Sequence, residues 1–456
     1  MKNVKRGRPA GSANKNKTKK KVQQPEQSVE LQYALHLLKQ KRFARVESIT
    51  HEWNGKCWQA LKVDDTIRRA WEWLVTTSPK QVSKNKSESC ANSATVPMKE
   101  LVVNNDYRRA FVPCNSYMLE IKQDGKLVQH EHSKGFNNTY VINADLPTDE
   151  GVAKLFKAFI ETSLPDPEVR GLVQEYIGYT LLPDCRFEVG QFWHGEGSNG
   201  KSVLAQLVSA LHGNGVRSAR LDKLSGFGLQ DIIGATLVAC DETPSKGIDD
   251  QTIKTLISGN PVLVDRKNRD PLTLRISAKW IVNTNTVPHT EQSHAWWRRW
   301  HIIHWDTVIP DEAKIHNLTE KIIENELGYV LKWAIEGLQR LLERGSFNVP
   351  QSVANHKDKF AEMADSAKAY LSDFEIHGSA EGSIKSKVYN KYKEWCSENG
   401  MRPLNSSNFW TRTGSIAKAK GMVAETFRRG SEGRRINLVF VEKNSDTGDE
   451  NDCVPF

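Results

Sequence analysis

The sequence lacks the features that define several classes of protein. Its seven cysteines are odd in number and scattered, and no two form a Cys-x-x-Cys pair, which argues against a disulfide framework and against a zinc ribbon. No apolar run approaches the roughly 20 residues that span a bilayer, and the N-terminus has no signal-peptide core. We therefore expect a cytoplasmic protein that does not associate with membranes. Its 456 residues are enough for roughly two to four domains.

Acidic side chains are absent from the first 24 residues, which carry nine basic ones and so account for the whole formal net charge of +9. The composition of residues 1–28 predicts disorder. Within this tail, Arg6-Gly7-Arg8-Pro9 resembles the core of an AT-hook, in which Arg6 and Arg8 would enter an A·T-rich minor groove. The alternative is a generic basic tail that binds phosphates without sequence preference.

A glycine-rich stretch in the middle of the chain is the strongest indication of function in the sequence. A short apolar strand ends at His194, and a helix with apolar positions at helical spacing opens near Ser202. Between them, Gly195 to Ser202 fits the phosphate-binding pattern of Gly, four residues and Gly-Lys-Ser/Thr. Backbone N–H groups of such a loop surround phosphate oxygens at a helix N-terminus. The predicted nucleotide contacts are Gly195, Glu196, Gly197, Ser198, Asn199, Gly200, Lys201 and Ser202, with Lys201 at the β- and γ-phosphates and Ser202 on Mg²⁺.

An apolar run from Thr236 to Cys240 ends in Asp241-Glu242. A buried parallel strand with acids at its C-terminal end is typical of the active-site edge of an open α/β sheet. Asp241 would hold Mg²⁺, and Glu242 would orient the attacking water. The alternative is an ordinary strand that ends in solvated acids.

Three further segments follow at short intervals. A strand at residues 280–282 leads into Asn285, whose amide could sense the γ-phosphate. Before it, residues 262–265 and 272–276 predict a hairpin with basic residues at its tip, or simply a solvated basic turn. After it, Trp296-Trp297-Arg298-Arg299-Trp300 predicts an aromatic-rich helix carrying two arginines. These arginines could form an arginine finger or a surface pair.

The flanking regions read as separate modules. Residues 29–150 predict a mixed domain with helices at 29–45 and 66–76, a polar loop at 81–94 and short strands over 111–142. Residues 151–186 predict helices that lead into the motor segment, which we end at 310, and 311–357 a helical connector. Over 358–443, three short helices and two strands predict a winged-helix domain, with Arg434 and Arg435 on its wing. A protein-docking domain is the alternative, and the acidic end at 444–456 predicts disorder.

The order of these elements resembles that of the superfamily 3 helicases, in particular the phage and plasmid primase-helicase family with satellite-phage and poxvirus-type members. The resemblance rests on Tyr176 to Leu181, on the Asn199-Gly200-Lys201-Ser202 form of the loop and on Trp296 to Arg299. It covers residues 60–305 well and continues more loosely to about residue 443. The segment from Phe111 to Leu146 is similar to the helicase-associated domain of that family.

The resemblance implies an α/β fold, a P-loop AAA+-like helicase core with a parallel sheet, between an N-terminal mixed domain and a C-terminal winged helix. It implies a hexameric ring on single-stranded DNA, with ATP and Mg²⁺ bound between subunits. Lys201 and Ser202 would bind the triphosphate and the metal, Asp241 and Glu242 would form the Walker B pair, and Asn285 would be the sensor. Arg298 or Arg299 would reach the neighbouring site, and Lys267 and Arg269 would contact DNA. No strand bears an Asp-x-Asp pair, so we expect no primase activity, and a separate primase or polymerase becomes a conceivable partner.

Three hypotheses follow from these residues. The first is an ATP-dependent DNA helicase that replicates a phage or another mobile element in a bacterial cytoplasm. The second is an initiator that binds an origin through its tail and winged helix, with ATP switching only its assembly. The third, an unrelated P-loop enzyme such as a small-molecule kinase, fits poorly with a basic hairpin and DNA-facing appendages.

Overall fold

The computed structural model describes residues 27–102, 109–149, 151, 153–241, 248–267, 269–286, 294–399, 401, 403–429 and 433–443. The chain divides into two compact units, one with residues up to 50 and from 61 to 99, the other with residues 51–60 and 100 onward. Residues 100–149 therefore group with the second unit, while the domain limits expected from the sequence remain predictions. No helix within the described ranges combines the length and hydropathy needed to cross a membrane.

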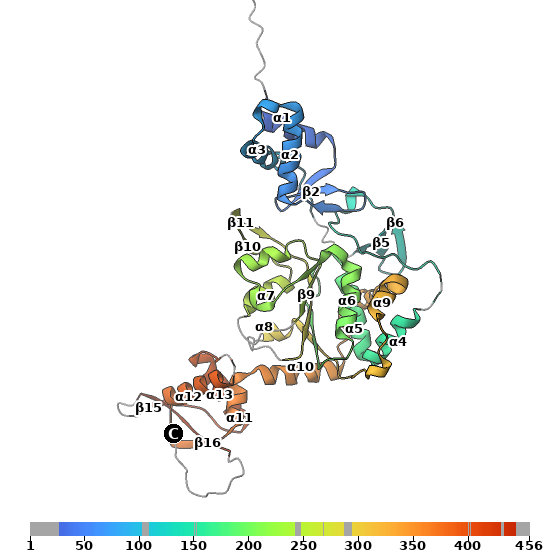
Figure 1. Ribbon diagram of the computed structural model, residues 1–456. Coiled ribbons are helices and arrows are strands. Elements are labelled where there is room, and N and C mark those ends of the chain that lie inside the picture. The colour runs from blue at the N-terminus through green and yellow to red at the C-terminus, as the bar shows by residue number, and fades with distance from the viewer. Residues whose placement is uncertain are drawn as a thin grey trace, which may run out of the picture. The chain divides into compact units, whose positions relative to one another are not determined.

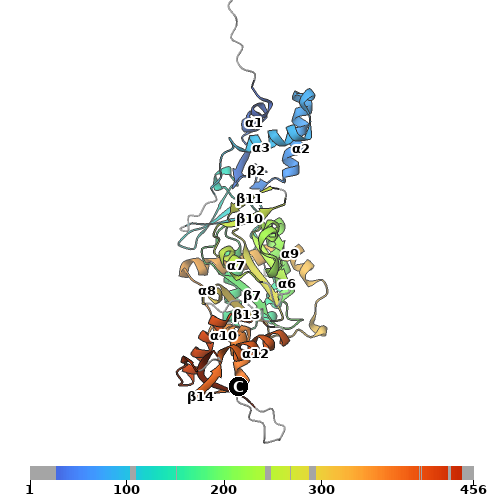
Figure 2. The same cartoon turned by 90° about the vertical axis from the view of Figure 1, so that its left-hand side faces the viewer.

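The first unit is a small helical cluster. Its elements are α1 (Val29–Lys39), β1 (Phe43–Val46), α2 (Val63–Thr77) and α3 (Lys84–Thr95). The three helices lie side by side (Figures 1 and 2) and share one apolar core. The sequence prediction of a loop over 81–94 is wrong. Ser83 caps α3 by accepting a hydrogen bond from the Lys86 N–H, and the small side chains of Cys90, Ala91 and Ala94 are buried in the helical core, so burial outweighs the polar composition.

The second unit begins with short antiparallel strands. In β2 (Ile49–Trp53), the residues from His51 onward pair with β3 (Trp58–Ala60). The strands expected over 111–142 are confirmed as a meander of β4 (Ala110–Pro113), β5 (Met118–Ile121) and β6 (Leu127–His130).

A five-stranded parallel sheet forms the centre of the second unit, in the order β13-β7-β12-β9-β8. The chain is thus a mixed α/β protein, as the sequence predicts. The strands are β7 (Gly190–His194), β8 (Val216–Ser218), β9 (Leu237–Asp241), β12 (Lys279–Thr284) and β13 (Trp300–His304). β12 lies between β7 and β9 and pairs in parallel with both.

Helices cover both faces of this sheet. Neighbouring strand residues point to opposite faces, so Trp193 and Ile303 join one core and Phe192 and Ile302 the other. The first core holds α4 (Lys154–Ser163), α5 (Pro167–Thr180), α6 (Lys201–His212) and α9 (Leu318–Arg344). The second holds α7 (Asp250–Ile257), α8 (His294–Trp297) and part of α10 (Gln351–Ala364). Figure 1 shows α5, α6 and α9 on one side of β9 and α7 and α8 on the other.

Beyond α10, the chain folds into three helices and a three-stranded antiparallel sheet ordered β14-β16-β15. The elements are α11 (Ser366–Ser372), β14 (Phe374–Ile384), α12 (Lys385–Glu398), α13 (Ser406–Ala419), β15 (Thr426–Arg428) and β16 (Arg434–Glu442). The three expected helices and the two expected strands are confirmed. The sequence analysis missed β14, because its segment from Gly378 to Gly382 interrupts the apolar alternation where the pairing with β16 shifts register.

Candidate nucleotide-binding site

Two glycines fix the shape of the loop between β7 and α6. Gly195 and Gly200 have φ values of +153° and +91°. A Cβ on Gly195 would collide with the carbonyl oxygen of Trp305, and one on Gly200 would collide with Ser163 and Phe159. The loop therefore lies against α4 and the segment after β13 more closely than any side chain would permit.

Lys201 is the first residue of α6 and is only 6% exposed. Its ammonium donates hydrogen bonds to the carbonyl oxygen of Gly195, to that of Glu196 at 3.2 Å and to Asn285 Oδ1 at 3.4 Å. Burial lowers the pKa of this amine. The structure thus brings the predicted lysine and the predicted sensor asparagine together at the loop.

Asp241 ends β9, and its exposed carboxylate lies beside the neighbouring strand. The Asn283 amide donates a hydrogen bond of 2.8 Å to Asp241 Oδ1. Asn283 pairs in register with both Asp241 and Trp193, so the carboxyl ends of three strands meet at one edge. Sequence reasoning selected Asn285 and passed over Asn283, although both belong to one Asn-Thr-Asn stretch.

A cavity of about 720 Å³ opens beside the loop. It is of the size that small-molecule and cofactor sites usually have. Its polar wall contains Ser202, Asp241, Asn283 and Asn285, together with the loop residues from Gly197 to Lys201. Its other wall comes from α4 and from the segment before α9, with mostly apolar residues: Leu155, Ala158, Phe159, Thr162, Ile309, Ala313, Ile315 and Leu318.

Lys314 is a further cation of this cavity that the sequence did not reveal. Its ammonium lies 3.2 Å from Ser198 Oγ and 2.5 Å from the Asp311 carboxylate. The hydrogen bond from Lys314 lowers the pKa of Asp311. No motif surrounds Lys314, so only the folded chain brings it to the loop.

Arg298 and Arg299 lie in a turn between a helix and a strand. The sequence predicted them on a helix, which is wrong: α8 ends at Trp297, and β13 begins at Trp300. Trp296 and Trp300 are fully buried. Trp300 pairs in register with Gly190 of β7, so the chain leaves the helix through a turn that the Arg299 N–H closes on the Trp296 carbonyl.

The turn leaves the arginines in different environments. Arg299 donates to Ser258 Oγ at 3.0 Å and to the Ala295 carbonyl at 2.7 Å, and its side chain is 12% exposed. Burial lowers the pKa of this guanidinium, and the neighbouring Arg298 lowers it further. The side chain of Arg298 is exposed and makes no hydrogen bond or ion pair with the described part of the chain. Neither arginine lines the cavity of its own chain.

The basic hairpin is confirmed, as β10 (Val262–Arg266) paired with β11 (Arg269–Leu274). Lys267 is exposed at its tip, where its N–H donates to Gln230 Oε1 over 3.2 Å. The side chain of Arg269 lies outside the described residues, as do Glu242, Arg6 and Arg8, so their predicted roles have no structural counterpart here.

In the C-terminal module, Arg434 is exposed and pairs across the sheet with the equally exposed Arg428. Arg435 is held against the chain and donates to the carbonyl oxygens of Glu381 and Gly382 at 3.0 and 3.1 Å. The sequence analysis placed both arginines on the wing. In the structure only Arg434 is exposed, whereas Arg435 is half-buried against the neighbouring backbone.

Comparisons with known proteins match two parts of the chain. Residues 193–299, which run from the loop strand to the Arg pair, match a family of unknown function, DUF5906. Residues 367–452 match the model described as poxvirus D5 protein-like. The poxvirus-type resemblance is therefore supported for the C-terminal segment, at the level of a D5-type protein.

Among solved structures, the chain is similar to apo structures of the NrS-1 C-terminal region. One has 13% identity and a TM-score of 0.49 and covers 91% of this chain and 99% of that one. Another has 12% identity and a TM-score of 0.48, with coverages of 90% and 99%. A likeness at this level carries no argument about what the chain does. A search of curated proteins found no match.

Proposed function

We propose that this protein is an ATP-dependent DNA helicase of a phage or another mobile genetic element, working in a bacterial cytoplasm. One observation carries the proposal: a cavity of nucleotide size is lined by Lys201, Ser202, Asp241 and Asn285 at the carboxyl edge of a parallel sheet. These are four of the residues that the sequence assigned to ATP and Mg²⁺.

The cavity supports an assignment of parts to the nucleotide. The loop and Lys201 would hold the β- and γ-phosphates, and Ser202 and Asp241 offer the oxygen ligands that Mg²⁺ prefers. The apolar wall with Phe159 and Leu318 suits a purine base. Lys314 adds a second cation near the phosphates.

The strand order of the parallel sheet supports the assignment to the superfamily 3 helicases. In chain order the parallel strands are first β7, then β8, β9, β12 and β13, and their spatial order is fifth, first, fourth, third, second. This is the arrangement that we assign to a P-loop core of AAA+-like type in a superfamily 3 helicase. The order helix, strand, two helices, strand and strand from α11 to β16 is that of a winged helix, with Arg428 and Arg434 on its exposed wing.

The position of Arg298 supports a ring in which a neighbouring subunit would complete the site. Arg298 is exposed and remote from its own cavity, as a finger that acts in trans must be. Arg299 is engaged within its own chain, so we assign the finger to Arg298. Lys267, exposed at the hairpin tip, would contact single-stranded DNA in the channel of a hexamer, together with Arg269.

The test is ATP-driven strand displacement on a labelled partial duplex. The wild-type protein should release the strand only with ATP and Mg²⁺, and Lys201→Ala should release none. Lys254→Ala changes a lysine of α7 outside the cavity and serves as the control. If ATP only drives assembly of the wild-type protein on duplex DNA, without steady hydrolysis and without strand displacement, the ATP-switched initiator replaces the helicase.

A further inference from the structure

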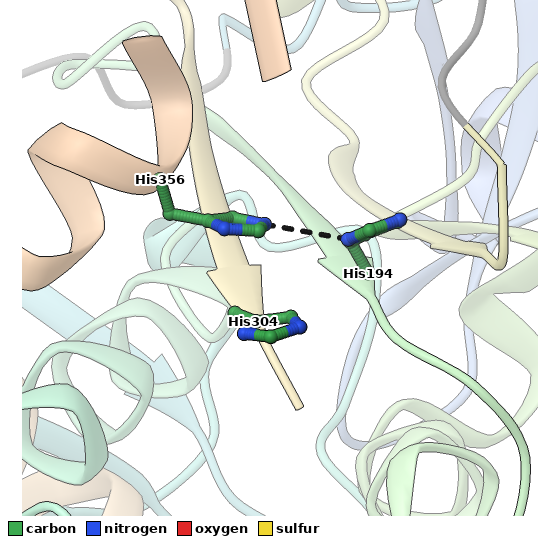
Figure 3. Close-up of side chains that lie close together, drawn as sticks. All are labelled: His194, His304 and His356. Carbon is green, nitrogen blue, oxygen red and sulfur yellow. Dashed lines mark hydrogen bonds between the residues drawn. The ribbon is translucent and has the colours of Figure 1, made fainter. Parts of the chain in front are cut away.

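Three histidines from distant parts of the chain meet next to the glycine-rich loop. His194 ends β7 and directly precedes Gly195, His304 ends β13, and His356 lies on α10. One nitrogen from each ring can be chosen so that the three atoms all lie within 4.8 Å of one another. Figure 3 shows His194 and His356 facing each other edge to edge, with His304 beneath the ring of His356. None of the three side chains lines the nucleotide cavity.

The separation of two of these nitrogens matches that of metal ligands. His194 Nδ1 and His356 Nε2 are 3.3 Å apart. Two nitrogens bound to a tetrahedral zinc ion at about 2.0–2.1 Å lie about 3.3 Å apart. The observed pair therefore has the spacing of two zinc ligands without any movement of the backbone.

We propose that His194, His304 and His356 form a binding site for a divalent transition metal, with Zn²⁺ as the ion. Three imidazoles with an open fourth position are an established zinc ligand set. Imidazole also suits Cu²⁺ and Ni²⁺, so the ligands select a class of metal and exclude Mg²⁺, which requires oxygen donors.

The third ligand must turn to bind. His304 is stacked on His356 with ring centroids 4.4 Å apart and an angle of 15° between the planes, so their in-plane lone pairs run side by side. Because His304 is exposed, rotation about its side-chain bonds brings one nitrogen toward the other pair. This rearrangement needs no change in β13.

The cluster is partly enclosed by the fold, since the side chains of His194 and His356 are half-buried. The buried side chain of Phe360 closes one side of the cluster and lies 5.1 Å from His194, centroid to centroid. Asp306 supplies nearby negative charge, whereas Lys201 and Lys359 oppose the charge of a cation.

A bound ion would fasten α10 to the ends of β7 and β13, two neighbouring strands of the parallel sheet. α10 ends at Ala364, and the next residue, Asp365, caps the N-terminus of α11. The ion would therefore link the helix that leads to the C-terminal module with the residue that precedes the phosphate loop. The site is a structural clamp and takes no part in the proposed ATP chemistry.

The experiment uses the full chain without a polyhistidine tag, freed of metal by a chelator. Zn²⁺ is titrated in competition with a chromophoric chelator for the wild type, His304→Gln and His356→Gln. We expect one Zn²⁺ per wild-type chain and binding at least about tenfold weaker in both variants. His316→Gln removes an exposed histidine outside the cluster and should leave Zn²⁺ binding unchanged.

A second measurement does not depend on how well the variants fold. Co²⁺ added to the wild-type protein should give the strong visible absorption of a four-coordinate site, and Zn²⁺ should displace it. Wild-type binding no stronger than that of either folded variant, or a wild-type Co²⁺ spectrum typical of six-coordinate aqueous ion, would overturn the proposal. The cluster would then be a stacked, hydrogen-bonded packing contact.

Discussion

Asn283 donates a hydrogen bond from its side-chain amide to Asp241 over 2.8 Å, and this contact fixes one carboxylate oxygen at the edge of the sheet. The Asn283→Ala variant should lower ATP turnover about 10- to 100-fold, since partners that orient a metal ligand have effects of this size. The KM for ATP should change little. Asn325→Ala removes an exposed asparagine of α9 and should match the wild type in steady-state assays; equal turnover in both variants would show that Asn283 orients nothing.

Gly197 and Gly200 lie in the same glycine-rich loop but have different surroundings, so an alanine substitution should have different effects at the two positions. Gly200→Ala places a Cβ against Ser163 and Phe159 at a φ of +91°, which costs about 1–3 kcal/mol and distorts the loop. Gly197→Ala meets nothing within 4 Å and should be tolerated. The affinity of each variant for ATP is measured with a fluorescent ATP analogue, and its free energy of unfolding is measured with a denaturant. Equal ATP affinity in both variants would contradict the loop geometry that we assign to the site.

Because Arg298 and Arg299 have different surroundings, we expect different effects when each is replaced by alanine. Arg299→Ala removes hydrogen bonds to Ser258 and Ala295 and should lower the free energy of unfolding by about 1–3 kcal/mol. Arg298→Ala should change it by less than about 0.5 kcal/mol but abolish ATP turnover. Urea unfolding together with turnover assays tests this. Full turnover in Arg298→Ala would exclude that residue as the finger.

Stability should fall as the pH falls below neutrality. Burial lowers the pKa of His212 from 6.5 to about 3, so between these values the unfolded chain takes up a proton that the folded chain refuses. The free energy of unfolding therefore decreases by up to about 1.4 kcal/mol per pH unit for this histidine and is unaffected by it above its unfolded pKa.

The variant His212→Gln isolates this effect. Glutamine does not titrate, and it keeps a polar side chain beside Thr180 and Thr236, the two partners of the His212 ring. Between pH 6.5 and 5, urea unfolding should show a loss about 1–2 kcal/mol smaller than in the wild type. His316→Gln, at an exposed position, should keep the wild-type slope. A slope unchanged by His212→Gln would show that the ring is protonated in the folded chain.

The parts of the site that the sequence predicted are those encoded locally. The strand, glycine turn and helix around Lys201 follow one another without interruption, and the apolar run before Asp241 ends at its carboxylate. Asn285 follows a strand in the same way. In each case the backbone that positions the side chain is adjacent in sequence.

The parts that the sequence did not predict depend on long-range contacts. The apolar wall of the cavity comes from α4 and the segment before α9, whose Leu155 and Leu318 look like ordinary core residues. Lys314 reaches Ser198 across 116 positions. The turn at Arg298 follows from the pairing of Trp300 with Gly190 in the parallel sheet, a long-range contact that the spacing of the aromatic residues does not reveal.

The most direct test of the account is steady-state ATP hydrolysis with and without single-stranded DNA, for Lys201→Ala, Arg298→Ala and a mixture of the two. We predict strong DNA stimulation of the wild type, no turnover in either variant alone and partial recovery in the mixture. Recovery is expected because a Lys201-intact site can receive Arg298 from a neighbouring subunit. Turnover that ignores DNA and survives in Arg298→Ala would contradict a ring motor with a shared site.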